Sequence, residues 1–496
     1  MTTAQDLTNF AREALHGRQF IAAIQREPYL HVNTPEGIQA QKSIGGASAV
    51  LLDTIFRATG GTLVAWAAGD ADDKVVDSQN RVKIPPGEEK YTLKRLFLSK
   101  KELDQWYYGM ANQTLWPLSH TVFVKPAFRE SWWRSYVKIN WRYTQAILEE
   151  IQDDNAFVWV HDYHLALVPK MLREQRPKLS IGIFWHIPWP TAETFRICPW
   201  RHDILEGLLG ADLVGFHRHY HVENFIDCLR EEIGVIVESE PRSVLHQKRL
   251  TKIMHFPAGI DVQEIDQKLA TQPTIAAADV AKELGLSLDS PYLILGVDRF
   301  DYTKGFVERL RILDRFFEKY PHYQHRVTHV AIAVPSRISI PAYKAYNSKV
   351  NRMVERINKK YQKNGWKPIH LVEKGIARDR LFDYYRAADI CLVTPLDDGM
   401  NLVAKEFVAA AQPDKGMLVL SRFTGAAKDL HLAIHTNPYD TDGSADALNY
   451  ALNMSPQDKR QRNEEMRHVL QENNTYRWGI EFIRQTTSEN LTQLYL

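Results

Sequence analysis

Three cations in this 496-residue chain follow apolar runs, where a charge has little structural reason to be. Arg299 and Lys304 lie five residues apart in "LGVDRFDYTKGF" (295–306), across a turn that leads into a helical pattern. Arg337 follows a second apolar run, in "AIAVPSRISI" (331–340). Cations beside the first turn of a helix, whose N–H groups are free, form a site suited to a diphosphate. The alternative is an exposed turn with solvated charges, and this motif alone does not decide between the two.

Carboxylates form a second candidate group, in "LVTPLDDGMNLVAKEFVAA" (392–410). We expect a buried strand, an acidic turn at 397–399 and a helix over 400–410 whose free N–H groups face a ligand. Asp398 either caps this helix or contacts the ligand. Glu406 follows eight residues later, about 12 Å along the helix. Both carboxylates can therefore contact one elongated ligand such as a sugar nucleotide, Asp398 at the sugar hydroxyls and Glu406 at the ribose.

The first half of the chain places histidines directly after apolar runs. His161, Asp162 and His164 follow "FVWV", and His186 follows "IGIFW" before a rigid Pro-Trp-Pro segment. No third ligand has zinc-like spacing to His161 and His164. "HRHYH" (217–221) lacks the Glu of H-E-x-x-H, and "GDADD" (69–73) is a short motif in a hydrophilic turn. We therefore expect neither a metal site nor a cofactor.

Short apolar runs that alternate with helical patterns must position these residues. This alternation predicts an α/β protein with parallel sheets covered on both faces. The pattern occurs in two blocks separated near 255–274, so we expect two doubly wound domains that face each other, with a ligand cleft at the strand ends. The strand candidates are 20–24, 62–66, 156–160, 180–185, 212–216, 292–297, 327–334 and 388–396, and the helix candidates are 165–175, 221–233, 305–319 and 340–364.

Composition limits the partners of the protein. A net charge of +2 gives no overall attraction to nucleic acid or membrane. No apolar run approaches the roughly 18 residues that a membrane span needs. Residues 1–20 lack the apolar core of a signal peptide and predict an amphipathic helix. Cys198, Cys228 and Cys391 lie far apart, which fits a reducing cytoplasm. We expect small-molecule substrates, and the sequence leaves a homo-oligomer open.

Five motifs together resemble the trehalose-6-phosphate synthase family of retaining glycosyltransferases, in the family's order and spacing. The resemblance runs from about Ile24 to the C-terminus and rests on "TLWPLSH" (114–120), "WVHDYHL" (159–165), "HIPWP" (186–190), "VDRFDYTKG" (297–305) and "PLDDGMNLVAKEFVAA" (395–410). It implies two facing Rossmann-like domains of the GT-B type. These are an acceptor-binding domain at 1–258, completed by a helix at 477–496 that crosses back to it, and a nucleotide-sugar-binding domain at 259–476.

The resemblance also implies roles for individual residues. Arg299 and Lys304 match the pair that binds the donor diphosphate, Asp398 the carboxylate at the donor glucose, and Glu406 the one at the ribose. His186 matches the histidine beside the reacting sugar. The remaining positions implied for the donor are Gly46, Gly399, Met400, Asn401, Leu402 and Val403. The positions implied for the acceptor are Arg26, Tyr107, Trp116, Asp162 and Arg337.

The implied reaction is glucosyl transfer from a nucleotide-diphosphate glucose, with UDP-glucose favoured, to glucose 6-phosphate, catalysed by His186, Asp162, Arg299 and Lys304. No carboxylate pair shows the spacing of a double-displacement glycosidase, so front-face transfer is preferred. Two departures lie on the acceptor side. "QREPY" (25–29) replaces the family's usual "SNR" and resembles glucosylglycerol-phosphate synthases, and His217 stands where many members have Gln. Glycerol 3-phosphate is therefore the alternative acceptor.

Two other classes of protein remain as rivals. A non-catalytic sugar-phosphate sensor usually loses a donor-site charge, whereas Arg299, Lys304, Asp398 and Glu406 are all present. A nicotinamide-dependent dehydrogenase would carry GxGxxG after its first strand, and none is found. A sensor releases no nucleotide and a dehydrogenase needs a nicotinamide, so product assays separate these classes.

Overall fold

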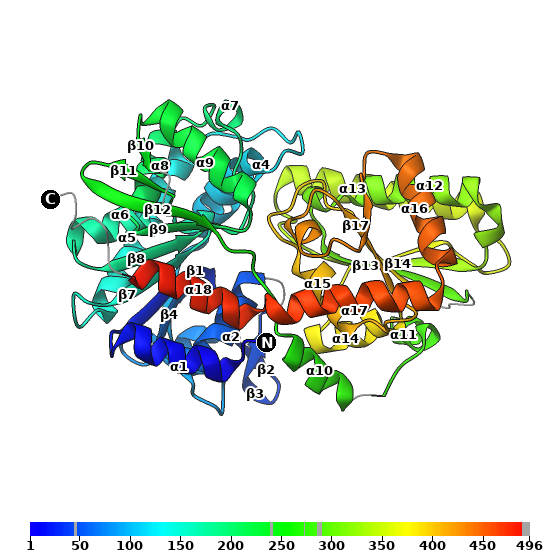
Figure 1. Ribbon diagram of the computed structural model, residues 1–496, viewed down its shortest axis with the longest axis horizontal. Helices are drawn as coiled ribbons and strands as arrows, with labels where there is room; N and C mark the ends of the chain where they lie inside the picture. Colours follow the sequence, from blue (N-terminus) through cyan, green and yellow to red (C-terminus); the bar gives the residue numbers. More distant parts are fainter. Residues whose placement is uncertain (44–46, 239–241, 272, 285–289, 489–496) are drawn as a thin grey trace. The chain divides into compact units, whose positions relative to one another are not determined.

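The chain folds into two compact α/β units (Figure 1). The computed structural model describes residues 1–43, 47–238, 242–271, 273–284 and 290–488. The N-terminal unit consists of Thr2–Ala258 together with the chain from Thr475 onward, and the C-terminal unit consists of Gly259–Asn474. Each unit has its own large sheet, with helices on both faces.

The N-terminal unit is built on a sheet with parallel strands at its centre and antiparallel strands at both edges. The spatial order is β10-β11-β12-β9-β8-β7-β1-β4-β6-β5. The strands are β1 (Phe20–Arg26), β4 (Thr62–Trp66), β5 (Arg81–Ile84), β6 (Tyr91–Leu96), β7 (Phe157–His161), β8 (Ser180–Phe184), β9 (Leu213–Phe216), β10 (Ile236–Glu238), β11 (Ser243–His246) and β12 (Arg249–His255). A separate hairpin joins β2 (Tyr29–Thr34) to β3 (Gly37–Lys42).

The strand order of this sheet reverses between β1 and β7. The chain proceeds from β1 to β4 on one side and from β7 to β8 on the other. In doubly wound sheets, ligands bind beside the carboxyl ends of the strands at such a reversal. Arg26 ends β1 and His161 ends β7, so the topology places both at this position.

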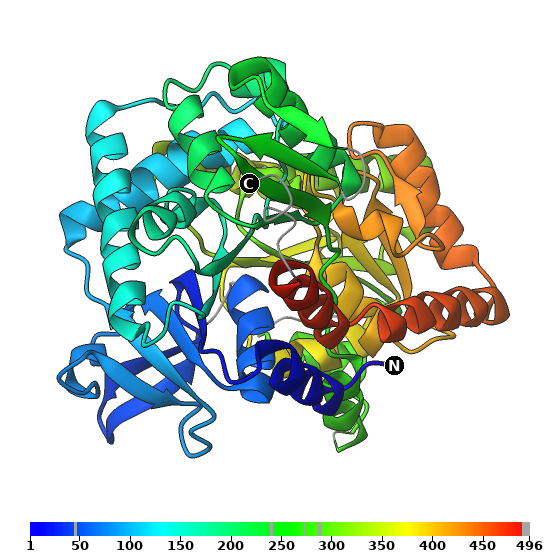
Figure 2. The same ribbon diagram turned by 60° about the vertical axis from the view of Figure 1, so that its left-hand side comes forward.

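Helices cover both faces of the N-terminal sheet. One face carries α1 (Ala4–Leu15), α2 (Ala47–Thr59) and α18 (Thr475–Thr487), and the other carries α5 (Glu130–Glu150), α6 (Val168–Gln175), α8 (Arg201–Leu209) and α9 (His219–Glu232). Helices α1 and α18, from opposite ends of the chain, lie side by side in both views (Figure 2). A Cβ atom at Gly182 would lie 2.6 Å from the ring of Phe482, so this glycine allows α18 to approach β8.

Short helical segments complete the N-terminal unit: η1 (Asp72–Lys74), α3 (Lys100–Leu103), the π-helix η2 (Asp104–Leu115), α4 (Trp116–Ser119), η3 (Tyr163–Leu165) and α7 (Ala192–Phe195). The π-helix was not expected from the sequence. Such helices are rare and frequently occur at functional sites. It carries Tyr107, one of the residues implied for the acceptor.

The C-terminal unit contains a fully parallel sheet with the order β15-β14-β13-β16-β17-β18. The strands are β13 (Tyr292–Arg299), β14 (Val327–Val334), β15 (Ile369–Val372), β16 (Ile390–Val393), β17 (Met417–Ser421) and β18 (Ile434–Thr436). The order reverses between β13 and β16. Arg299 ends β13, and the acidic turn at 397–399 follows β16, so the donor-side candidates lie at this reversal.

Two layers of helices enclose this second sheet. One layer contains α12 (Phe306–Lys319), α13 (Pro341–Tyr361) and α16 (Thr441–Asn453), and the other contains α10 (Val262–Ala270), α11 (Ala277–Glu283), α14 (Arg378–Ala387), α15 (Leu402–Ala410) and α17 (Pro456–Glu472). The short segments are η4 (Tyr302–Lys304), η5 (Pro321–Tyr323) and η6 (Gly425–Lys428). Among the described residues, no helix is long and apolar enough to span a lipid bilayer.

The α/β fold expected from the sequence is confirmed, with differences in detail. The N-terminal sheet has antiparallel edge strands, which the apolar runs did not indicate. Helix α15 begins at Leu402 rather than at residue 400. The expected C-terminal helix is α18, which packs on the N-terminal unit; residues 489–496 lie outside the described part.

Candidate active site

The ends of β13 and β16 bring together cations and carboxylates in the C-terminal unit. Nζ of Lys304 donates to Oδ2 of Asp398 at 2.5 Å. Nδ2 of Asn401 donates to the same oxygen at 3.0 Å. A guanidinium nitrogen of Arg299 lies 4.0 Å from Oδ2 of Asp301. The structure therefore joins Lys304, Asp398 and Asn401 directly and places Arg299 beside a further carboxylate.

Asn401, rather than Asp398, caps helix α15. Its side-chain oxygen accepts the N–H of Ala404 at 2.9 Å, and its backbone has a φ of +91°. Left-handed conformations are uncommon outside glycine, although asparagine adopts them more readily than most residues. The interpretation of Asp398 as the cap is wrong, because its carboxylate instead receives Lys304 and Asn401.

The remaining charges of α15 are paired inside the unit. Lys405 is fully buried and donates to Asp429 at 2.5 Å. Glu406 accepts from Nε of Arg378 at 2.7 Å, and Arg378 also donates to Glu264 at 3.0 Å. Burial would lower the pKa of Arg378, but the charges of Glu406 and Glu264 outweigh it and raise that pKa above its usual range. Arg378 fixes Glu406, and no spacing in the sequence indicated this contact.

Asp301 anchors a second cation at the same edge. It is fully buried and accepts hydrogen bonds from Arg337 at 3.2 Å and from the Tyr343 hydroxyl at 3.0 Å. Burial opposes ionisation of Asp301, but the charges of Arg337 and Arg299 prevail and lower its pKa. Arg337 itself has a φ of +52°. Asp301 lies inside the 297–305 motif, so that motif was the signal that could have identified it.

Histidines and one aspartate occupy the corresponding edge of the N-terminal unit. Nδ1 of His161 lies 3.0 Å from Nε2 of His186. Oδ1 of Asp162 accepts the backbone N–H groups of Tyr163 at 3.0 Å and His186 at 3.3 Å, and Oδ2 lies 3.6 Å from Nδ1 of His164. Asp162 has φ +74° and ψ 165°, a region that is costly for any residue except glycine. The aspartate thereby holds the loops after β7 and β8 together.

Burial decides the protonation of the two histidines. It lowers the pKa of His186 to about 4, against a raising effect of Asp162, and it lowers the pKa of His161 well below its usual value. Burial would raise the pKa of Asp162, but the hydrogen bond and charge of His164 outweigh it and lower that pKa. At neutral pH the edge therefore presents two neutral imidazoles beside an ionised carboxylate.

The residues implied for the acceptor are distributed over both units. Arg26 ends β1 at the strand reversal. Tyr107 lies nearly parallel to the His164 ring, with centroids 5.6 Å apart, and Trp116 lies 4.1 Å from the His120 ring. Arg337 belongs to the C-terminal unit, so its convergence with Arg26 on one phosphate stays a prediction. Gly46 lies outside the described residues.

The described residues contain no cluster of three or more His, Cys, Asp or Glu side chains that could hold a metal ion. Asp72, in the 69–73 segment, is fully buried, so the expectation of a hydrophilic turn is wrong for this residue. It accepts the N–H of His31 at 2.7 Å and that of Gly69 at 2.6 Å, and it pairs with Arg95 at 2.8 Å. Its carboxylate thus fixes the segment to β2 and β6.

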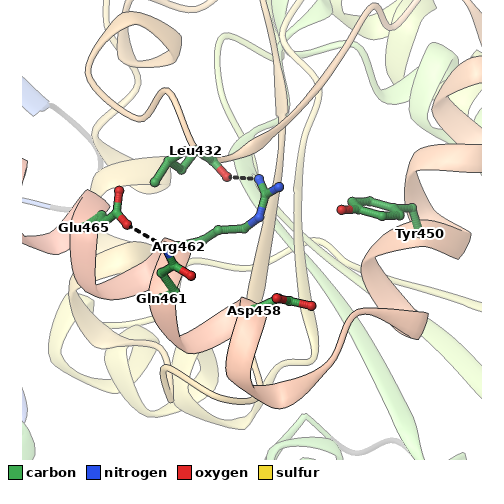
Figure 3. Close-up of a pocket in the computed structure, with 6 residues that line it drawn as sticks. All are labelled: Leu432, Tyr450, Asp458, Gln461, Arg462 and Glu465. Carbon is green, nitrogen blue, oxygen red and sulfur yellow. Dashed lines mark hydrogen bonds between the residues drawn. The ribbon is translucent and has the colours of Figure 1, made fainter.

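A surface pocket of about 320 Å³ lies in the C-terminal unit, between α16 and α17 (Figure 3). It is lined by Leu432, Tyr450, Asp458, Gln461, Arg462 and Glu465. Arg462 donates to the carbonyl oxygen of Leu432 at 3.0 Å, and Gln461 donates to Glu465 at 3.1 Å. None of the residues expected to bind the donor or the acceptor lines this pocket, so it is not the candidate active site.

Comparisons of the sequence with a family model and with known proteins agree on one family. The sequence model of glycosyltransferase family 20 matches residues 18–488. A trehalose-6-phosphate synthase of Mycolicibacterium gilvum (strain PYR-GCK) is 39% identical over 474 residues, which cover 94% of this chain and 92% of that protein.

Two solved structures extend the comparison to the fold. One, described as trehalose-6-phosphate from E. coli bound with UDP-2-fluoro glucose, has a TM-score of 0.83 and 32% identity, covering 95% of this chain and 99% of that one. The other is a UDP-forming trehalose-phosphate synthase of Burkholderia xenovorans in complex with glucose-6-phosphate. It has a TM-score of 0.83 and 31% identity, covering 95% of this chain and 100% of that one.

Proposed function

The chain belongs to glycosyltransferase family 20, and we propose that it transfers glucose from UDP-glucose to glucose 6-phosphate. It is an enzyme of the trehalose-6-phosphate synthase type, and the proposed products are trehalose 6-phosphate and UDP. Structural relatives bound to UDP-2-fluoro glucose and to glucose-6-phosphate support these substrates. The observation that carries the proposal is the group of Arg299, Lys304 and Asp398 at the reversal of the C-terminal sheet.

Arg299 and Lys304 are proposed to bind the donor's diphosphate. Negative charge develops on the diphosphate as the anomeric bond breaks, and fixed cations stabilise that charge most where water is excluded. In the structure Lys304 donates to Asp398. A diphosphate carries more negative charge than one carboxylate and is therefore proposed to attract Lys304 more strongly. The left-handed Gly305, with φ +67°, turns the chain directly from Lys304 into α12, whose first N–H groups add to the anion site.

The sugar and ribose of the donor are assigned to the segment from Asp398 to Glu406. Asp398, positioned by Asn401, is proposed to accept hydroxyl groups of the glucose. Glu406, fixed by Arg378, is proposed to accept those of the ribose. The start of α15 provides free backbone N–H groups. Residues without a hydrogen-bonding side chain can therefore contribute to the site through their backbone. These positions are Gly399, Met400, Leu402 and Val403.

We propose that transfer retains the anomeric configuration by front-face attack. The leaving phosphate accepts the proton of the attacking acceptor hydroxyl, so no protein nucleophile is needed. His186, neutral at pH 7, positions the reacting sugar, and Asp162 orients the acceptor side. Both oxygens of Asp162 already have partners in the loops after β7 and β8, which suits an orienting role better than nucleophilic attack.

Four side chains are assigned to the acceptor. Arg26 and Arg337 are assigned to its phosphate, with Tyr107 and Trp116 beside its sugar ring. Glucose 6-phosphate requires room for a ring at these aromatic side chains, whereas glycerol 3-phosphate does not. The likeness to a relative in complex with glucose-6-phosphate favours the sugar phosphate. Glycerol 3-phosphate stays the second candidate because "QREPY" departs from the family pattern.

A matrix of substrates tests the proposal. UDP-, ADP- and GDP-glucose are each combined with glucose 6-phosphate and with glycerol 3-phosphate, and the released nucleoside diphosphate is measured. We expect the highest rate with UDP-glucose and glucose 6-phosphate, with an α,α-linked product. A higher rate with glycerol 3-phosphate supports the second candidate, and no release from any pair supports a sensor.

The proposal extends to the location and assembly of the protein. The three cysteines, all free and buried, support the proposed cytoplasmic location. The proposed partners are the two small-molecule substrates. Sedimentation of the purified protein tests whether copies of the chain associate into a homo-oligomer.

A further inference from the structure

Two imidazole rings meet edge to edge at the carboxyl end of the N-terminal sheet. His161 is the last residue of β7, and His186 follows β8. Their planes differ by 24° and their centroids are 5.3 Å apart, while Nδ1 of His161 and Nε2 of His186 are separated by 3.0 Å. Rings in this arrangement share one hydrogen bond through these two nitrogens. The direction of that bond decides what His186 offers to a substrate.

Both rings are neutral at physiological pH, because burial lowers the pKa of each. A neutral imidazole carries its proton on one nitrogen and a lone pair on the other. If His161 donates from Nδ1, then Nε2 of His186 accepts and His186 carries its own proton on Nδ1. If His186 donates from Nε2, its Nδ1 is an acceptor and His161 carries a proton on Nε2.

The surroundings of His161 distinguish these two arrangements. Nε2 of His161 is buried and has no hydrogen-bond partner among the described residues. The indoles of Trp159 and Trp478 lie against the ring, with centroids at 4.6 and 6.4 Å. Their Nε1–H groups are also buried without an acceptor in the described part of the chain. No described residue accepts a hydrogen bond from Nε2 of His161, so a proton on this nitrogen would add another unsatisfied donor.

Buried N–H groups without a partner are rarer in proteins than incompletely satisfied acceptors. A lone pair on Nε2 of His161 is therefore the less costly state. This places the His161 proton on Nδ1, where it faces Nε2 of His186.

We propose that His161 donates its Nδ1 proton to His186 and holds His186 in the tautomer that carries a proton on Nδ1. Nδ1 of His186 forms no hydrogen bond with any described residue, so it can donate to a substrate oxygen. The inference rests on the proposed function, in which His186 positions the reacting sugar. It makes His186 a hydrogen-bond donor that takes up no proton during transfer, and it makes His161 a positioning residue.

The tautomers can be measured directly. Protein labelled with ¹⁵N-histidine is studied by long-range ¹H–¹⁵N correlation at pH 7.5, and the signals are assigned with the His161→Asn and His186→Gln variants. We expect protonated Nδ1 and unprotonated Nε2 signals for both residues. A protonated Nε2 on either histidine would overturn the proposal. The measurement needs no substrate, so it stands even if the proposed reaction is wrong.

Kinetics test the positioning role. The amide of His161→Asn places an N–H close to the original Nδ1–H, whereas His161→Leu cannot donate. We expect His161→Leu to lower kcat about 10- to 100-fold with little change in KM for the nucleotide sugar, and His161→Asn to restore most of the lost kcat. Equal kcat values for His161→Leu and the wild type would overturn the role.

Trp478→Phe is the matched control, because it keeps an aromatic ring beside His161 and removes only the indole N–H. It should leave kcat unchanged. If His161→Leu does not fold, the comparison of His161→Asn with the wild type and the NMR measurement still decide the question. A protein that shows the expected tautomers yet transfers glucose to neither acceptor contradicts the proposed function and leaves the hydrogen-bond assignment intact.

Discussion

The two sheets present different chemistry at their strand reversals. In the N-terminal unit, the ends of β7 and β8 present neutral histidines beside one aspartate, burial keeps these imidazoles uncharged, and Arg26 ends the neighbouring β1. The C-terminal unit presents full charges in contact with one another: Lys304 with Asp398, Arg378 with Glu406 and Arg337 with Asp301. The same topology therefore supports two different ways of placing polar groups out of water.

The difference follows from what each edge is proposed to bind. A diphosphate carries a charge that only fixed cations can balance, and buried cations require paired carboxylates in order to be tolerated. The sugar rings that the histidines are proposed to face are neutral and are recognised by hydrogen bonds, which neutral imidazoles provide without the cost of burying a charge. Arg26, at the same reversal, is proposed to face the charged phosphate of the acceptor. Strained backbone occurs at both edges, at Asp162 and at Asn401. Such strain persists where the surrounding structure fixes it, often at functional sites.

Removing a cation from the C-terminal edge should have the largest effect. We expect Lys304→Ala to lower kcat about 100- to 1,000-fold, because the leaving diphosphate loses a fixed positive charge. Steady-state release of nucleoside diphosphate measures it. The matched control is Lys360→Ala, which removes an exposed lysine paired with Asp314 in the same unit. Near-normal turnover of Lys304→Ala would break the contrast between the two edges.

Acidification should destabilise the histidine edge. Below pH 6.5, its ordinary pKa, His186 takes up a proton in the unfolded chain, whereas in the folded chain it resists protonation until about pH 4. The unfolded state then binds more protons, so this group lowers the free energy of unfolding by at most about 1.4 kcal/mol per pH unit across that window. Urea titrations at pH 7, 6 and 5 measure the slope.

The contribution of His186 is isolated by substitution. His186→Gln should lose less stability than the wild type between pH 6.5 and 4, while His468→Gln, at an exposed histidine, should follow the wild type. Asp301 at the other edge has a lowered pKa, so its contribution is lost only as the pH falls below its ordinary 3.8. Identical slopes for His186→Gln and the wild type would contradict the assignment.

Substitution of Asn401, the cap of α15 with a left-handed backbone, should reveal the energetic cost of this backbone conformation. We expect Asn401→Ala to cost about 2 kcal/mol, from the lost cap and from the positive φ. Ser455 caps α17 and has an ordinary φ of −62°. Ser455→Ala removes this cap and should cost about 1 kcal/mol. The difference between the two, measured by urea unfolding, gives the combined cost of the positive φ and of the lost hydrogen bond from Asn401 to Asp398. Equal costs would show that Asn401 is not strained.

The smallest expected effect concerns the ribose. We expect Glu406→Gln to raise KM for the nucleotide sugar about tenfold with kcat nearly unchanged, because its contacts are the same in the ground and transition states. Glu318→Gln, at an exposed carboxylate of the same unit, is the control. A fall in kcat without a change in KM would show that Glu406 acts in the chemical step and not in binding the donor.

Much of the fold could be predicted because buried parallel strands leave continuous apolar runs in the sequence. The strands β5, β10 and β11, at or next to the edges of the N-terminal sheet, were missed, since they are short and partly exposed and leave no such run. The sequence left open whether Asp398 caps α15, because any Asp or Asn before a helix favours capping and only the backbone shows that Asn401 is the residue positioned to cap.

The sequence by itself determined that cations and carboxylates follow the strands of the second half of the chain, and that histidines follow those of the first. Local order along the chain suffices for this, because a strand end and the loop after it are contiguous. Tertiary structure alone decided that Arg378 holds Glu406, that Asp301 holds Arg337 and that His161 meets His186. These partners lie 25 to 36 residues apart, and only the packing of separate strands and helices brings their side chains within hydrogen-bonding distance.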